Sequence, residues 1–240
     1  KAKEIGMSST NFANASGINN PDNYSTVRDI ALMSKYLIEN YPIYYEYFEE
    51  TEFTWERTGG DPITQGNRNT LLYKNIGVDG IKTGHLAVEA YSLASSIKKN
   101  KRRLIAVGSG FKTNSLRASE SRKLLSWGLT NTETFEISKK NETVFDIESW
   151  LTQKKSISGY TKEDFYITID KKDLKYFNVF IEYTGPIKAP IKKDTEIAFI
   201  KAYNKDDLIK SIPIYATEKS KKINFLLSIF TSFNYMIWGD

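Results

Sequence analysis

The residues of this chain that could do chemistry most readily form the run Lys82-Thr83-Gly84-His85. A partly desolvated lysine beside a cleft can hold a carboxylate and help to move a proton, because it is both a charge and a tunable acid. The hydroxyl of Thr83 can bind the same carboxylate. Gly84 has no side chain, so an extended peptide can approach its backbone as an added strand would. The run therefore predicts a strand that binds a peptide carrying a carboxylate.

The triplet Lys-Thr-Gly is weak evidence by itself. It arises by chance in roughly one chain in eight of this composition, so its context must decide its meaning. A nucleotide-binding P-loop is one reading that the context excludes. Such a loop needs glycine directly before Lys-Thr, and Ile81 stands there instead.

Composition excludes several other classes of site. The 240 residues include no cysteine and one histidine, which excludes disulfides and thiol catalysis and argues against a metal site or a Ser-His-Asp triad. We therefore expect no metal and no cofactor. The net charge of +5 comes from scattered lysines rather than a basic block, which argues against a nucleic-acid partner. A solvated lysine-rich surface, with weak attraction to anionic polymers or lipid headgroups, fits better.

The elements that must position the run can be predicted from periodicity and capping signals. Ser25 or Thr26 can cap a helix that Pro42 ends, with Asp29 placed as in a capping box. Residues 51–76 look rich in loops, with a turn at 59–62. Two further strands are expected at 90–97 and 103–109, joined by a polar turn, and then a helix that opens at Asn114 or Ser115 and stops at Gly128.

Beyond about residue 132 the pattern changes to short alternating or β-branched runs, which predict a separate β-rich domain. These runs are residues 165–169, 177–183, 196–203 and 212–215. The chain closes on a helix with lysines before it and apolar residues on one face, including Ile223, Phe230 and Phe233. Its apolar stretch is too short and too polar to span a bilayer, and we expect it to lie in the membrane interface. The alternative is a helix docked on the protein's own core.

Several segments, taken in order, resemble the low-molecular-mass penicillin-binding proteins, the serine-type D-alanyl-D-alanine carboxypeptidases of the penicillin-binding protein 5/6 group. The matching segments are residues 6–18, 24–31, 67–69, 78–85, 117–128 and 189–191. The resemblance covers nearly the whole chain and corresponds to the C-terminal two-thirds of such a protein. It implies an α/β transpeptidase/β-lactamase-like domain, truncated at its N-terminus, over residues 1–131. A small all-β domain over 132–218 and an amphipathic membrane-surface helix over 219–240 would follow.

The resemblance also implies roles for particular residues. Lys82 and Thr83 would contact the substrate, and the backbone N–H of His85 would donate to the oxyanion of the tetrahedral intermediate. The ring of His85 would orient the strand or transfer a proton. Arg117 matches an arginine associated with the terminal carboxylate of the substrate, and Arg68 matches a basic residue at the edge of the site. For both, the alternative is an ordinary surface ion pair. Family members usually have Thr where this chain has Leu86, which affects the geometry expected of the strand.

The family's nucleophile motif, Ser-x-x-Lys, and its Ser-x-Asn motif are expected to precede residue 1. Three internal pairs have the first spacing, namely Ser95/Lys98, Ser96/Lys99 and Ser109/Lys112. About two such pairs are expected by chance, and all three follow Lys82 in the hairpin region, so we interpret them as non-catalytic. Ser9-Thr10-Asn11 has the second spacing but lies in the run that follows the true motif in the family.

The function implied is that of a serine-type D-Ala-D-Ala carboxypeptidase acting on peptidoglycan pentapeptides through an acyl-enzyme, with β-lactams as inhibitors. This chain would be a fragment without the nucleophile. The protein would be periplasmic and attached peripherally to the outer face of the cytoplasmic membrane. Three alternatives stay open: a DD-endopeptidase, a β-lactamase of the same clan, and a non-catalytic envelope protein that binds peptidoglycan or membrane.

Overall fold

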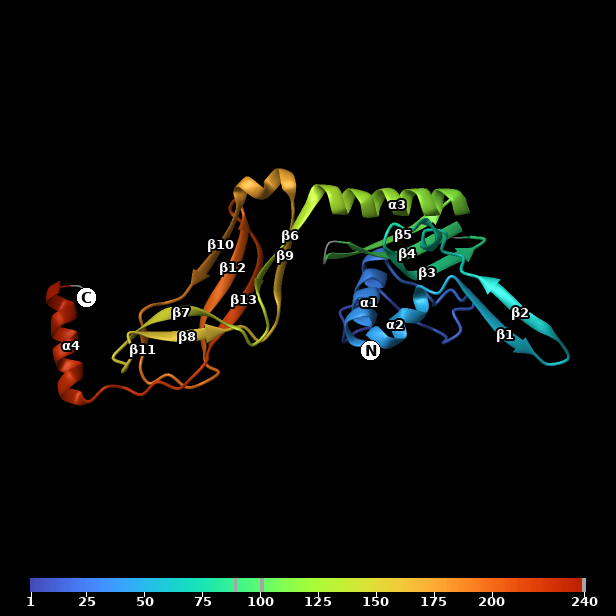
Figure 1. The fold of residues 1–240 in the computed structure, drawn as a ribbon. Coiled ribbons are helices and arrows are strands. Elements are labelled where there is room, and N and C mark those ends of the chain that lie inside the picture. Colours follow the sequence, from blue (N-terminus) through green and yellow to red (C-terminus); the bar gives the residue numbers. More distant parts are fainter. Residues whose placement is uncertain (89, 100–101, 239–240) are drawn as a thin grey trace. The chain divides into compact units, whose positions relative to one another are not determined.

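The computed structural model describes residues 1–88, 90–99 and 102–238. It divides into two compact units, Lys1–Thr130 and Asn131–Asp240 (Figure 1). The Lys-Thr-Gly run lies in the first unit, and the predicted β-rich region forms the second.

An antiparallel three-stranded sheet in the order β3-β4-β5 forms the centre of the first unit. Its strands are β3 (Val78–Leu86), β4 (Ala90–Lys99) and β5 (Arg102–Phe111). The predicted hairpin is confirmed, although its strands extend further and the turn residues 100–101 lie outside the described residues. Lys82-Thr83-Gly84 lies on β3, which is an edge strand of this sheet. An edge strand keeps one row of backbone groups free, which is the arrangement that peptide binding by strand addition requires.

The helix predicted to start at Ser25 or Thr26 is confirmed, and it packs against β4 and β5. Helix α1 (Val27–Asn40) is capped by Thr26, whose side chain accepts a hydrogen bond from the backbone N–H of Asp29. The capping box is incomplete, because the Asp29 carboxylate is buried and accepts from Ser9 and Thr10 instead. The helix ends before Pro42, which opens the short helix α2 (Pro42–Tyr45), followed by η1 (Glu46–Phe48).

The prediction of a loop over residues 51–76 was wrong for most of its length. Strands β1 (Glu52–Arg57) and β2 (Gly60–Gly66) form an antiparallel ribbon around the predicted turn, and η2 (Leu72–Lys74) follows. Almost every residue of the ribbon is exposed, so the sequence carries no strong alternation between apolar and polar positions. The alternate aromatic residues Phe53 and Trp55, which stack with ring centroids 6.2 Å apart, were the signal available.

Helix α3 (Asn114–Asn131) begins where the sequence predicted but does not stop at Gly128. A Cβ at Gly128 would lie 2.9 Å from Leu104 Cδ1 on β5. The glycine therefore allows close packing of helix on sheet, and it was wrongly predicted to end the helix. The buried residues between α3 and the sheet are Leu71, Leu93, Ile97, Ala106 and Leu125.

The second unit is β-rich, as the sequence predicted. A six-stranded sheet in the order β10-β12-β13-β8-β7-β11 packs through one apolar core with a two-stranded sheet, β6-β9. The strands are β6 (Thr132–Ser138), β7 (Thr143–Trp150), β8 (Ser156–Tyr160), β9 (Phe165–Asp170), β10 (Phe177–Glu182), β11 (Ile187–Lys188), β12 (Glu196–Asn204) and β13 (Asp207–Ala216), with η3 (Lys171–Tyr176) before β10. On β9, residues 165, 167 and 169 are buried and alternate with more exposed ones, which is the period-2 pattern that made this strand predictable.

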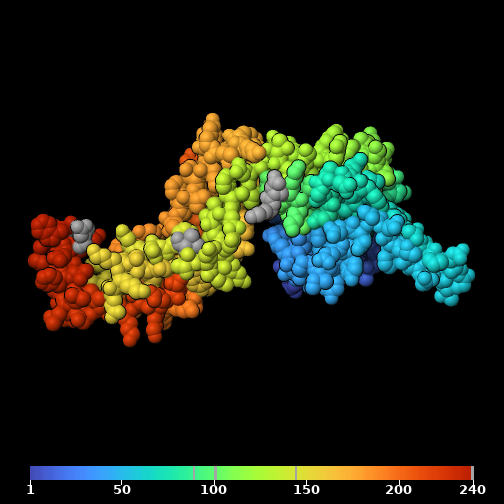
Figure 2. Space-filling view, viewed as in Figure 1, coloured from blue at the N-terminus to red at the C-terminus, as the bar shows by residue number. Residues whose placement is uncertain are grey.

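The last helix, α4 (Phe225–Trp238), which is red in Figure 2, has many exposed apolar side chains. Ser228 is its one buried residue among those described, and Tyr235 contacts the ring of Trp150 at 5.7 Å between centroids. The apolar arc consists of Phe225, Leu226, Ile229, Phe230, Phe233, Met236 and Ile237, all exposed. No helix in the described part of the chain is long and apolar enough to cross a bilayer.

Candidate active site

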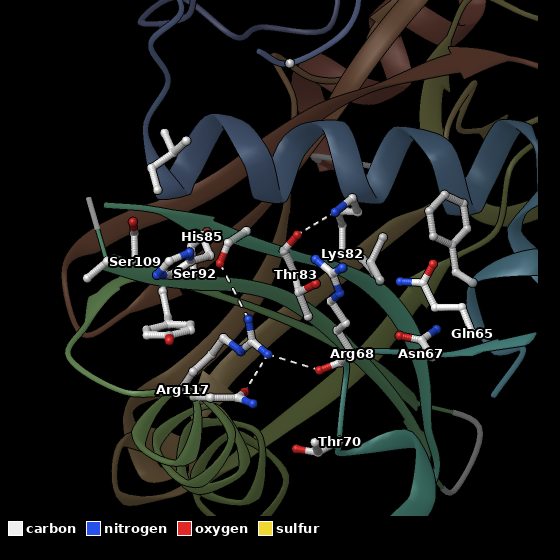
Figure 3. A pocket seen from close by; sticks show the side chains of 18 of the residues that line it. Gln65, Asn67, Arg68, Thr70, Lys82, Thr83, His85, Ser92, Ser109 and Arg117 are labelled. Carbon is white, nitrogen blue, oxygen red and sulfur yellow. Dashed lines mark hydrogen bonds between the residues drawn. The ribbon is translucent and has the colours of Figure 1, made fainter. Parts of the chain in front are cut away.

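A cleft of about 1000 Å³ runs beside β3. It is lined by residues 81–86 of β3, by the segment around Arg68 and by the first turn of α3 (Figure 3). All of these belong to the first unit, and together they contain every candidate residue that the sequence singled out.

Lys82 is exposed on β3 while its neighbour Ile81 is buried in the core beneath the sheet. The alternation of a strand thus directs the lysine into the cleft and anchors the strand beside it. Lys82 Nζ donates to the backbone oxygen of Thr83 at 2.5 Å. Among the ion pairs of the described residues none includes Lys82, so its charge is available to a ligand.

The structure gives a second reason for glycine at position 84. A Cβ there would collide with the hydroxyl of Ser92, which is the residue opposite on β4. Gly84 therefore makes room for Ser92, which also lines the cleft. Close approach of a substrate backbone to Gly84 stays a prediction.

His85 is exposed at the end of the run and pairs with Tyr91 across the β3–β4 ladder. The two rings lie 4.2 Å apart between centroids and are tilted by 40°. The imidazole thus contacts its own sheet through the ring of Tyr91, which supports a role of the His85 side chain in orienting the strand. The backbone N–H of His85 remains the candidate oxyanion donor.

Arg117 on α3 is buried, with 5% of its surface exposed. Its Nη2 donates to the carbonyl of Arg68 at 3.0 Å and to Asn114 Oδ1 at 2.6 Å. These partners are neutral, and burial lowers the pKa of the Arg117 guanidinium. The surface ion pair considered from sequence is therefore absent among the described residues. A buried cation held by neutral groups is a natural site for an anionic ligand.

Arg68 is exposed, and its side chain reaches toward Thr83 and Lys82 (Figure 3). The cleft thus gathers three cations, Lys82, Arg68 and Arg117, and its described lining contains no Asp or Glu. The proximity of Arg68 contributes to the lowered pKa of Arg117, as expected for like charges. Such a cleft can hold a carboxylate between a strand edge and a helix.

The internal serines do not form a nucleophile site with their paired lysines. Ser95 and Ser96 are fully buried, where Ser95 donates to the carbonyl of Ala106. Ser109 does line the cleft, but Lys112 is not part of its lining. Thr10, in the Ser-x-Asn look-alike, is bound to Asp29 at the start of α1, away from the cleft lining.

Sequence reasoning missed two asparagines. Asn114 was predicted only as a helix start, yet its side chain positions Arg117 three residues later. The i, i+3 spacing on a helix was the available signal. Asn69 is buried and donates to the backbone oxygen of Gly80 at 3.0 Å, which ties the loop before β3 to the strand.

Comparison with known proteins agrees with this architecture. Residues 1–113 match the family described as D-alanyl-D-alanine carboxypeptidase, and residues 133–222 match the penicillin-binding protein 5 C-terminal domain. The chain is 31% identical over 222 residues to D-alanyl-D-alanine carboxypeptidase DacD of Salmonella typhimurium, covering 92% of this chain and 56% of the relative. It is 34% identical over 226 residues to DacC of Escherichia coli, covering 93% and 55%. The chain thus spans about half the length of the curated relatives it matches.

Solved structures give the same result. Penicillin-binding protein 5 from Haemophilus influenzae superimposes with a TM-score of 0.82 at 30% identity, covering 92% of this chain and 64% of that chain. Penicillin-binding protein 6B from Escherichia coli gives a TM-score of 0.62 at 27% identity, covering 89% and 57%.

Proposed function

This chain belongs to the D-alanyl-D-alanine carboxypeptidase family of the penicillin-binding protein 5/6 group, and we propose that it forms part of a serine-type D-Ala-D-Ala carboxypeptidase acting on peptidoglycan stem peptides. The observation that carries the proposal is the cleft with three cations and no acidic residue in its described lining. A peptide that ends in D-Ala-D-Ala brings one free carboxylate, and this cleft offers it Lys82, Arg68 and the buried Arg117.

In the proposed reaction the substrate lies along the free edge of β3 as an additional strand. Lys82 and the Thr83 hydroxyl hold the terminal carboxylate beside Arg117. The backbone N–H of His85 donates to the oxyanion as a serine attacks the penultimate carbonyl, and removal of such a donor typically raises the barrier by about 3–4 kcal/mol. The terminal D-Ala then leaves, and water hydrolyses the acyl-enzyme.

We assign the serine nucleophile and its lysine base to residues outside this chain. The burial of Ser95 and Ser96, and the absence of Lys112 from the described cleft lining, support this assignment. A β-lactam would acylate the same serine, because its carboxylate would bind the same three cations and so place the lactam carbonyl beside that serine. The cleft would bind a DD-endopeptidase or β-lactamase substrate in a similar way, so the products of the reaction identify the activity.

The apolar arc of α4 supports attachment to a membrane surface. Its seven apolar residues are exposed, whereas Ser228, outside the arc, is buried. If α4 were docked on the protein's own core, its apolar arc would be buried. Amphipathic helices with exposed Phe and a basic flank partition into lipid headgroups. We therefore place the protein on the outer face of the cytoplasmic membrane, in the periplasm.

The function is tested by measuring the release of D-Ala from a peptide ending in D-Ala-D-Ala and the release of D-alaninamide from the C-terminal amide of the same peptide. The full-length protein should release D-Ala from the acid with a kcat/KM at least tenfold higher than it shows toward the amide. Loss of one charge-assisted hydrogen bond of about 1.5–3 kcal/mol accounts for that ratio. Binding of peptidoglycan without release of D-Ala would instead favour the non-catalytic envelope protein.

A further inference from the structure

Asp79 stands three residues before Lys82, and the proposed reaction gives it no role. The β3–β4 register shifts between Val78 and Gly80, so Asp79 lies at an irregularity in the ladder. Its carboxylate binds Arg103 of β5 with both oxygens, with Oδ2 at 2.7 Å from Nη2 and Oδ1 at 2.8 Å from Nη1. This paired geometry fixes direction as well as distance.

The ion pair joins four elements of the first unit. The hydroxyl of Tyr45 on α2 donates to Asp79 Oδ1 at 2.9 Å. Arg103 Nη1 also donates to the hydroxyl of Ser96 on β4 at 2.6 Å, and the guanidinium lies 5.2 Å from the centroid of the Tyr45 ring. One carboxylate on β3 is therefore tied to α2, β5 and, through Arg103, to β4.

Gly80, the next residue, is held from two sides. A Cβ there would lie 2.7 Å from the Tyr45 hydroxyl, so only glycine lets that hydroxyl reach Asp79. The carbonyl of Gly80 accepts the hydrogen bond from Asn69. The start of β3 is thus fixed by side-chain contacts at the point where its ladder with β4 is irregular.

We infer that Asp79 is a positioning residue, which fixes the start of β3 through Arg103 and Tyr45 and thereby sets the position of Lys82 and of the His85 N–H. This inference rests on the proposed function. Lys82 follows at about 10 Å along the strand, at about 3.3 Å per residue. A displacement of about 1 Å at a reacting group can cost roughly a hundredfold in rate, so a modest slide of the strand matters.

The test uses the full-length protein and three single variants. Asp79→Asn keeps the shape and removes the charge, and Arg103→Lys keeps the charge and removes the two-armed geometry. Leu125→Val is the matched control, because it weakens the buried core under α3 and leaves the Asp79–Arg103 ion pair intact. For each protein the acylation rate constant and the dissociation constant for penicillin are measured well below the melting temperature, together with amide hydrogen exchange over residues 81–85.

Asp79→Asn and Arg103→Lys should each slow acylation by about 10–100-fold while the dissociation constant changes by less than about threefold. Exchange over residues 81–85 should become faster, with α3 unchanged. Leu125→Val should acylate within about twofold of wild type even at an equal loss of melting temperature.

The inference would be overturned by acylation of Asp79→Asn at the wild-type rate, or by faster exchange spread evenly over the first unit. Acylation of Arg103→Lys at the wild-type rate would also overturn the inference, because a positive charge without the two-armed geometry would then be enough to position the strand. If the wild-type protein is not acylated at all, the proposed function fails, and local exchange over residues 81–85 still decides whether Asp79 positions the strand.

Discussion

Arg117 on α3 and Gly84 on β3 are 33 positions apart in sequence, yet Nη1 of the arginine lies 3.5 Å from the glycine carbonyl oxygen. The same guanidinium binds the carbonyl of Arg68, so it joins three segments of the cleft wall. These partners are neutral, so they do not balance the positive charge of Arg117. The contact therefore places an unneutralised cation against the strand that is proposed to bind substrate.

Replacing that cation should weaken recognition of a terminal carboxylate. Arg117→Gln is expected to lower kcat/KM toward a peptide acid by about 10–100-fold and to leave the peptide amide nearly unchanged. Arg122→Gln, an exposed arginine on the same helix, is the control and should leave both values unchanged. Equal losses on acid and amide would show that Arg117 supports the fold and does not read the carboxylate.

Substitutions at Gly84 and Ser92 should have non-additive effects on stability. Gly84→Ala introduces a Cβ that collides with the Ser92 hydroxyl, and we expect it to lower the free energy of unfolding by about 1–3 kcal/mol. In Gly84→Ala/Ser92→Ala the hydroxyl is gone, and much of that loss should be recovered. Urea denaturation of the four proteins in this cycle measures the coupling. Strictly additive losses would mean that the strands do not approach as described.

Stability should depend on Tyr45 at high pH. Burial raises the pKa of the Tyr45 hydroxyl to about 12, and the neighbouring Asp79 carboxylate acts in the same direction. Because the folded state holds this proton more tightly than the unfolded state, the contribution is complete below about pH 10 and is lost as pH rises toward 12. The difference in free energy of unfolding between wild type and Tyr45→Phe should shrink by about 1–3 kcal/mol over that window. A difference that stays constant with pH would contradict the burial of the hydroxyl.

The apolar arc of α4 should govern binding to lipid. Phe233→Glu is expected to reduce association with vesicles containing anionic lipid by at least tenfold, because a charge would enter the apolar part of the interface. Asn234→Glu adds the same charge beside the arc and is the control, with a markedly smaller effect. Vesicle sedimentation measures both. Unchanged binding of Phe233→Glu would exclude α4 as the attachment site.

Local patterns in the sequence predicted much of this fold. Thr26 marks the start of α1, and the alternation of β9 marks a strand with one buried face. The β1–β2 ribbon was missed because both of its faces are exposed and periodicity therefore carries little signal. Gly128 was misread because its reason is tertiary, namely the approach of Leu104, and no local pattern records such a contact.

The candidate site was predictable to a similar degree. Lys82, Thr83, Gly84, His85, Arg68 and Arg117 all line one cleft, as their common origin in the family resemblance implied. The partners of Arg117 could not be predicted in full, because the carbonyls of Gly84 and Arg68 approach it only through the packing of α3 on the sheet. The contact between Asn114 and Arg117 was missed, although the i, i+3 spacing of these residues on the predicted helix was an available signal.

We propose that this chain supplies the Lys-Thr-Gly part of an acyl-transfer site whose serine lies outside it. The decisive measurement is intact-mass detection of a penicillin adduct on this chain and on the full-length protein side by side. We expect one covalent adduct on the full-length protein and none on this chain. If this chain by itself forms an adduct, an internal serine such as Ser109 is the nucleophile. If neither protein forms an adduct, the assignment as a penicillin-sensitive carboxypeptidase is wrong.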